Sequence, residues 1–120
     1  MSFLDRIRYH RPPKTPAEAD ALALRQLESR GANLTKPRHV IHFLLFEGEA
    51  NARGAAEVIR GTSWKASVEA PSEHRTEWTV RADDERIVST ETVAAYRSWF
   101  EQIATQHDGE YDGWEAKAKP

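Results

Sequence analysis

Hydrophobic and polar residues recur along the chain with two spacings, and each spacing predicts a different kind of element. Apolar residues three or four positions apart predict helices over about residues 16–30, 49–60 and 90–107. The first helix has Thr15 as a suitable N-cap, and Pro16 follows it at the first helical position. Between the helices lie shorter apolar segments that have the pattern of strands.

Four short segments have this strand pattern. Residues 39–46 are apolar with almost no alternation, which is typical of a central strand covered on both faces. Residues 63–70 and 76–82 alternate cleanly and predict a hairpin of two half-exposed strands. The charged run at residues 83–86 breaks the alternation and predicts a loop. Residues 110–118 predict a strand that closes the fold.

The closing strand begins with Tyr111-Asp112-Gly113-Trp114, and Asp-Gly is a strong hairpin signal. A hairpin here would leave too short a strand before the turn, so we interpret the stretch as the start of the last strand. Strict alternation would place Tyr111 and Trp114 on opposite faces, but a β-bulge at Gly113 would re-aim one ring. We predict that Trp114 packs into the core, that Asp112 caps nearby backbone N–H groups, and that Tyr111 faces outward.

The order of elements, a helix followed by β-α-β-β-α-β, predicts an α+β fold. This pattern is typical of a ferredoxin-like split β-α-β arrangement, with an antiparallel sheet of four strands ordered 4-1-3-2 and two helices on one face. The extra N-terminal helix is expected to cover the other face or one end of the sheet. We expect residues 15–120 to form a single domain. Residues 1–14 carry a local charge of about +3, and we interpret them as a flexible basic segment.

The composition limits the class of protein. The 120 residues suit one domain, and 30% of them are charged, with a net charge of -2. A general nucleic-acid binder differs, because it needs many Lys and Arg side chains to neutralise phosphates. The absence of cysteine excludes disulfides, thiolate catalysis, zinc-finger sites and iron–sulfur clusters. No apolar run has the length of a signal peptide or a membrane span, so we expect a cytoplasmic protein.

Few residues have the spacing of a catalytic or metal site. His39 and His42 are three apart on a strand, so they point to opposite faces and cannot converge on a metal ion. Asp83, Asp84 and Glu85 form a group of a kind that binds cations or transfers protons, but a solvated turn is the favoured interpretation. The chain has no nucleophile motif and no phosphate-binding glycine loop. We therefore expect no enzyme activity, no catalytic residue, no metal and no cofactor.

The aromatic residues leave two interpretations open. Trp64, Trp78, Tyr111 and Trp114 can form an aromatic platform on the sheet, as in sheet-based RNA readers, or they can pack in the core. Core packing is favoured for at least two of the three tryptophans, because no RNA-binding signature is present and acidic residues flank them. Trp99 lies beside the buried stripe of the third helix, where an aromatic residue can contribute to an interface.

Four stretches of the chain resemble one known family. They are ALRQLESRGANLTKPRHVIHFLLF, ARGAAEVIRGTSWKASVE, STETVAAYRSWFEQIATQHDGEYDGW and, as the most specific piece, EYDGW directly after a helix. Over about residues 17–118 the chain resembles the RraB family, the B-type protein regulators of ribonuclease E. The resemblance implies a ferredoxin-like fold and a non-enzymatic role in a bacterial cell. Members studied as regulators bind ribonuclease E outside its catalytic chemistry, inhibit RNA cleavage and alter degradosome composition.

The resemblance also implies a protein partner, namely a ribonuclease E-type enzyme or its assembly, with no membrane and no direct binding of nucleic acid. This chain departs from the enteric regulator, which is strongly negative and has a long acidic tail. We therefore expect the fold to carry over better than the specific partner. A ligand-sensing or RNA-contacting module and a structural homo-oligomer are the alternatives. The partner contacts predicted from the sequence are Tyr111, Asp112, Trp114, Trp99, Arg6, Arg8 and Arg11.

Overall fold

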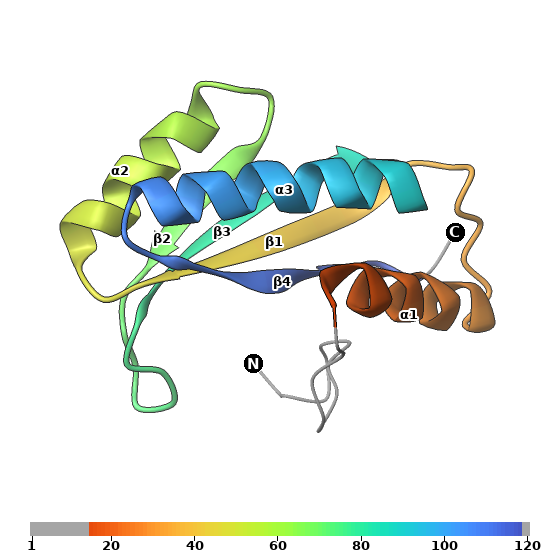
Figure 1. Cartoon of the computed structure of the whole chain (residues 1–120), viewed down its shortest axis with the longest axis horizontal. Coiled ribbons are helices and arrows are strands. Elements are labelled where there is room, and N and C mark those ends of the chain that lie inside the picture. Colours follow the sequence, from red (N-terminus) through yellow and green to blue (C-terminus); the bar gives the residue numbers. More distant parts are fainter. Residues whose placement is uncertain (1–14, 119–120) are drawn as a thin grey trace.

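Within residues 15–118, four strands form one antiparallel sheet, and three helices accompany it (Figure 1). The structure is a computed structural model that describes residues 15–118. The basic segment expected at residues 1–14 lies outside the described residues. The fold class is α+β, as the sequence predicted. The elements in chain order are α1 (Pro16–Ser29), β1 (Arg38–Phe46), α2 (Glu49–Arg60), β2 (Lys65–Glu69), β3 (Trp78–Arg86), α3 (Thr90–Gln106) and β4 (Glu110–Ala116).

The order of strands across the sheet is β2-β3-β1-β4, which reads 4-1-3-2 from the β4 edge. Each neighbouring pair is antiparallel. β1 therefore lies inside the sheet, between β3 and β4, and its side chains are buried almost throughout. This position confirms the prediction that the most apolar strand is central.

The main core lies between the sheet and the helices α2 and α3. Helix α2 contributes a stripe of three alanines and one isoleucine, and α3 contributes aromatic and aliphatic side chains. Half-buried aromatic residues, among them Trp78, Trp99 and Tyr111, pack against this core. The buried members of the main core are Leu44, Phe46, Ala52, Ala55, Ala56, Ile59, Trp64, Val80, Ala82, Phe100, Ile103 and Ala104.

Helix α1 lies beside one end of the sheet, on the same side as α3. Its residues Leu24 and Leu27 pack with Val40, Val88 and Val93 in a second cluster. Val40 belongs to the side of β1 that faces the helices, since side chains two apart on a strand share a face. Of the two positions expected for the extra helix, the one at the end of the sheet is therefore the one observed.

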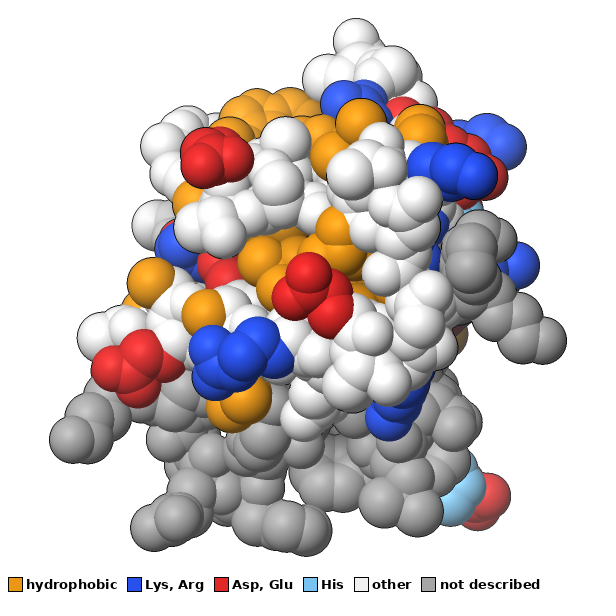
Figure 2. Space-filling model, turned by 90° about the vertical axis from the view of Figure 1, so that its right-hand side faces the viewer, with side chains coloured by type: hydrophobic (Ala, Val, Ile, Leu, Met, Phe, Trp, Pro, Cys, Tyr) orange, Lys and Arg blue, Asp and Glu red, His pale blue; other side chains and the backbone are white. Residues whose placement is uncertain are grey.

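The second cluster reaches the surface at the end of the molecule that carries α1. Figure 2 faces this end and shows hydrophobic side chains gathered near the middle, with acidic and basic side chains around them. Half-buried residues that pack against the cluster are Ala32, Leu34, Trp114, Ala116 and Ala118. This end of the fold is thus held together by leucines of α1, by valines and by the half-buried residues of β4 and of the segment between α1 and β1.

The acidic run after the second hairpin strand is part of β3, so its prediction as a loop is wrong. β3 extends to Arg86, which pairs with Arg38 at the start of β1. The acids have partners in this extended strand, because Asp83 Oδ2 lies 2.9 Å from His39 Nε2 and Asp84 accepts a hydrogen bond from Arg86 at 2.9 Å. Pairing with the central strand outweighs the low strand propensity of acidic residues.

β4 contains the bulge that the sequence predicted. Its register shifts between Phe43 and Leu44 of β1, since Gly113 pairs with Phe43 and Tyr111 pairs with Leu44. Asp112 is therefore the extra residue, and Gly113 adopts a positive φ of 112° that favours glycine. As a consequence, Tyr111 and Trp114 lie on the same side of the sheet, facing the helices. The expectation that Tyr111 faces outward is wrong.

The turn from α3 into β4 also depends on a glycine. The left-handed residue at the end of α3 is Asp108, with a φ of 58°, and not the glycine that follows it. Gly109 instead allows a close approach, because a Cβ atom at this position would clash with the ring of Phe46 and the carbonyl of Leu45. The glycine thus lets the start of β4 pack directly against the end of β1.

Candidate protein-binding face

The sheet has one face that none of the three described helices covers. Residues of all four strands point to it by alternation, and we call it the open face. On β1 an apolar column of Ile41, Phe43 and Leu45 runs along its middle, while charged residues flank this column on both sides. The members of the open face are His39, Ile41, Phe43, Leu45, Lys65, Ser67, Glu69, Thr79, Arg81, Asp83, Glu85, Glu110, Gly113 and Glu115.

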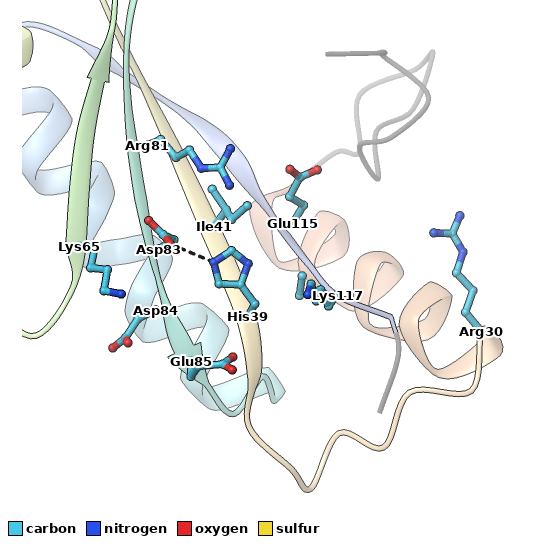
Figure 3. Close-up of a pocket in the computed structure, with 11 residues that line it drawn as sticks. Arg30, His39, Ile41, Lys65, Arg81, Asp83, Asp84, Glu85, Glu115 and Lys117 are labelled. Atoms are coloured by element: carbon cyan, nitrogen blue, oxygen red, sulfur yellow. Dashed lines mark hydrogen bonds and ion pairs between the residues drawn. The ribbon is translucent and has the colours of Figure 1, made fainter.

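A hollow of about 810 Å³ lies over one end of the open face and extends to the end of α1 (Figure 3). Ile41 is at its floor, between the charged side chains of β3 on one side and of β4 on the other. Side chains of both charges therefore line the same depression. The charged lining residues are Arg30, Lys65, Arg81 and Lys117, together with Asp83, Asp84, Glu85 and Glu115.

The register of the sheet explains how these charges are arranged. Asp83 lies between Ile41 of β1 and Lys65 of β2, and its carboxylate is also 2.9 Å from the ring nitrogen of His39. Arg81 lies between Phe43 and Ser67 in the next row. Over the whole open face, carboxylates outnumber Lys and Arg by five to two. A surface of this kind repels a phosphate backbone but can bind a polypeptide that carries charged side chains.

The residues that line the hollow are mostly charged. They include a histidine, lysines, arginines and several carboxylates, and no hydroxyl or thiol side chain is among the described lining residues. Within residues 15–118 no group of three or more potential metal ligands is present. The two histidines of β1 lie on opposite faces, as the sequence predicted.

Tyr111, a predicted partner contact, is engaged in the core. Its hydroxyl lies 2.7 Å from Nδ1 of His42, which is fully buried beneath α3. The His42 ring stacks on Phe100 with 4.5 Å between ring centroids and meets Trp64 edge-on. Burial lowers the pKa of His42 to about 3 and raises the pKa of Tyr111 well above its usual value. Both side chains are therefore neutral at pH 7.

Trp114, another predicted contact, joins three elements. Its indole N–H donates to Oδ1 of Asp20 in α1 at 3.0 Å. The other oxygen of Asp20 accepts a hydrogen bond from Nε of Arg97 in α3 at 2.9 Å. We call Asp20, Arg97 and Trp114 the α1 latch, because they connect α1 to α3 and β4.

Of the remaining predicted contacts, the structure describes Trp99 and Asp112. Trp99 is half-buried with its ring 4.8 Å from that of Phe100, and Asp112 is the extra residue of the bulge. Arg6, Arg8 and Arg11 lie outside the described residues. Trp99 and Tyr111 pack against the main core, whereas Trp114 packs against the second cluster.

The aromatic platform considered for RNA binding has no counterpart on the open face. Trp64, Trp78, Tyr111 and Trp114 all lie on the side of the sheet that faces the helices, where they pack in or against the two core clusters. The open face was not predicted, because the apolar alternation of the second hairpin strand ends at Ala82. Residues 83–86 are all charged and carry no alternation, so the extension of β3 to Arg86 had no local signal.

Comparison with known families identifies the chain. The family model described as Regulator of ribonuclease activity B, or RraB, matches residues 17–116. The chain belongs to the RraB family. The RraB match extends from α1 to the end of β4, so it includes the open face, the bulge and the α1 latch. A search of curated proteins found no match. RraB proteins are described as regulators of ribonuclease activity, which agrees with a role in binding a protein rather than in catalysis.

Proposed function

We propose that this RraB-family chain is a non-enzymatic regulator that binds a ribonuclease E-type enzyme, or the assembly around it, and lowers RNA cleavage. The observation that carries this proposal is the match of residues 17–116 to the family described as regulators of ribonuclease activity. The lining of the hollow, which has no hydroxyl or thiol nucleophile among its described residues, is compatible with a role without catalysis.

We further propose that the partner binds at the open face. Two observations support this location. The three described helices all lie on the other side of the sheet, and the hollow presents both charges around an aliphatic floor. A protein partner can match such a surface with complementary charges, which favour the correct partner and register.

The proposal also includes the fold type and the cellular location of the protein. The β-α-β-β-α-β order after α1 and the fully antiparallel sheet support a ferredoxin-like split β-α-β fold. A bacterial cytoplasm is the proposed location, because a regulator of RNA cleavage must meet the ribonuclease there. None of the helices within residues 15–118 is long and apolar enough to span a membrane.

Binding and cleavage assays with purified proteins test the proposal. The full chain is expected to bind a ribonuclease E-type enzyme from the same organism and to slow its cleavage of a labelled RNA. Arg81→Glu, on the open face, is expected to weaken binding by about tenfold, the size of a lost interface contact. Arg53→Glu is the matched control, because Arg53 is an exposed α2 residue on the other side of the molecule.

Two results would contradict the proposal at different levels. If the full chain neither binds the enzyme nor changes the rate of cleavage, the proposed regulatory function is wrong. If the parent binds the enzyme but both variants bind as tightly as it does, or if Arg53→Glu binds less tightly than Arg81→Glu, the location at the open face is wrong. The regulatory function is not contradicted by either result. Urea unfolding of each variant checks that the substitution has left the fold intact.

A further inference from the structure

Two apolar side chains of the open face are buried although no described helix packs there. Ile41 is 8% exposed and Phe43 is 6% exposed. Neither residue belongs to the main core or to the second cluster, which lie on the other side of the sheet. A segment that covers apolar side chains in the middle of a sheet face stabilises the fold, because it removes apolar surface from water.

The charge of the open face limits what can cover it. Glu69, Glu85, Glu110 and Glu115 surround the apolar column, and the face as a whole carries more carboxylates than Lys and Arg side chains. A covering segment that complements the face must therefore offer apolar side chains together with a net positive charge.

Residues 1–14 have this composition. Their apolar residues alternate locally with basic ones, as in Arg6-Ile7-Arg8-Tyr9, and their net charge is about +3 from direct count. The segment is also continuous with Thr15, the N-cap of α1. Fourteen residues can reach about 46 Å when extended, whereas the nine residues of β1 span about 30 Å, so length does not prevent the segment from reaching the open face.

We propose that the chain's own residues 1–14 bind the open face, with apolar side chains over Ile41 and Phe43 and arginines toward the flanking carboxylates. The segment shields an apolar strip that would otherwise favour association between copies. A partner that uses the same face must then displace the segment, so its apparent affinity is lowered by the fraction of chains in the shielded state.

A spin label within the segment tests the proposal without any partner. The chain has no cysteine, so His10→Cys provides one labelling site in the otherwise intact protein. Amide NMR signals of Phe43 and Arg81 on the open-face strands are expected to be lost through paramagnetic broadening. The signal of Val58 on α2, which is 45% exposed on the other side of the molecule, is expected to persist. Equal broadening at all three positions, or broadening at none, would overturn the proposal.

Two further experiments test whether the arginines of the segment are needed for binding and whether the bound segment belongs to the same chain. Arg6→Glu, Arg8→Glu and Arg11→Glu combined are expected to restore the lost signals. The control is the combination Arg25→Glu, Lys36→Glu and Arg53→Glu, which changes the net charge equally at exposed positions outside the open face. Persistent broadening in the first triple variant contradicts the proposal. Broadening in a mixture of isotope-labelled and separately spin-labelled chains would show a second copy's segment on the face and would also overturn it.

Discussion

At the scale of single residues, the polar His42 inside an apolar strand is the most informative position. Its ring is buried among aromatic side chains, and its Nδ1 has the Tyr111 hydroxyl as its partner at 2.7 Å. Burial keeps the imidazole neutral, because a charged ring at this depth would lose its hydration without gaining a counter-ion. The stability of the fold is therefore linked to pH through one side chain.

We predict that the protein becomes less stable as the pH falls below about 6.5. The pKa of His42 is about 3 in the folded chain and 6.5 as the ordinary value, so between these values only the unfolded chain binds the proton. The free energy of unfolding is then expected to fall by up to about 1.4 kcal/mol per pH unit from this residue. Urea unfolding of the parent and of His42→Phe between pH 7 and pH 4 measures the difference in slope. Equal slopes would contradict the prediction.

Gly113 carries a second prediction at this scale. Gly113→Ser is expected to cost about 1–3 kcal/mol of unfolding free energy, because a side chain is strained at a φ of 112° although no atom lies near the new Cβ. Gly48→Ser is the matched control, since Gly48 has an ordinary φ of -122°, open space and an N-cap position that serine favours. Urea midpoints compare the two variants. A cost at Gly48 equal to that at Gly113 would show that backbone strain is not the cause.

At the scale of elements, α1 depends on side chains that are remote in sequence. Its own pattern predicts a helix, and its cap confirms the start, with Thr15 accepting a hydrogen bond from the Glu18 N–H at 3.1 Å. Its position, however, comes from the second cluster and from the α1 latch. The formation of the helix thus follows from its own residues, whereas its position in the fold depends on contacts with residues that are distant in sequence.

We predict that Asp20→Ala loosens α1. The side chain of Asp20 is 9% exposed and that of Arg97 is 17% exposed, so removing the carboxylate leaves Nε of Arg97 and the indole N–H of Trp114 without their acceptor, and only the longer contact of Arg97 with Glu101 remains. The expected cost is about 2–4 kcal/mol, with faster amide hydrogen exchange in α1 than in α3. Glu49→Ala removes the exposed ion pair with Arg53 and is expected to cost less than about 0.5 kcal/mol. Similar costs for the two variants would contradict the role of the α1 latch.

At the scale of the whole molecule, the sheet has two edges that must not pair with other chains. On the β2 edge, Nε of Arg60 in α2 donates to the carbonyl oxygen of Ala66 at 3.0 Å. A long charged side chain placed on a short edge strand is a common device against edge-to-edge association. The bulge at Gly113 has the corresponding effect on the β4 edge, because it interrupts the regular spacing of backbone groups.

We therefore predict that Arg60→Ala increases self-association through β2. Light scattering at high protein concentration is expected to give a larger mean mass for this variant than for Arg53→Ala, which removes an arginine two turns earlier in α2 that pairs with Glu49. Disulfide capture between Val68→Cys chains carrying Arg60→Ala locates the contact. Equal masses for the two arginine variants would show that Arg60 does not protect the edge.

The sequence by itself determined the helices, the central strand, the bulge and the family, because these depend on spacings of a few residues. The spacing of apolar residues is a local property: side chains three or four positions apart share a helix face, and side chains two positions apart share a strand face. The bounds of α2 and the start of α3 agree with the predictions.

Only the tertiary structure decided where β3 ends, where α1 lies and which way Tyr111 points. β3 extends through its acidic run because β1 lies beside it as a template, and no local pattern contains that partner. The α1 latch joins Asp20 to Trp114 across 94 positions of the sequence. The open face arises in the same way, because charges that are scattered along the chain become neighbours only when four strands pair. Contacts between distant residues depend on the packing of the whole fold, and a local pattern carries no information about them.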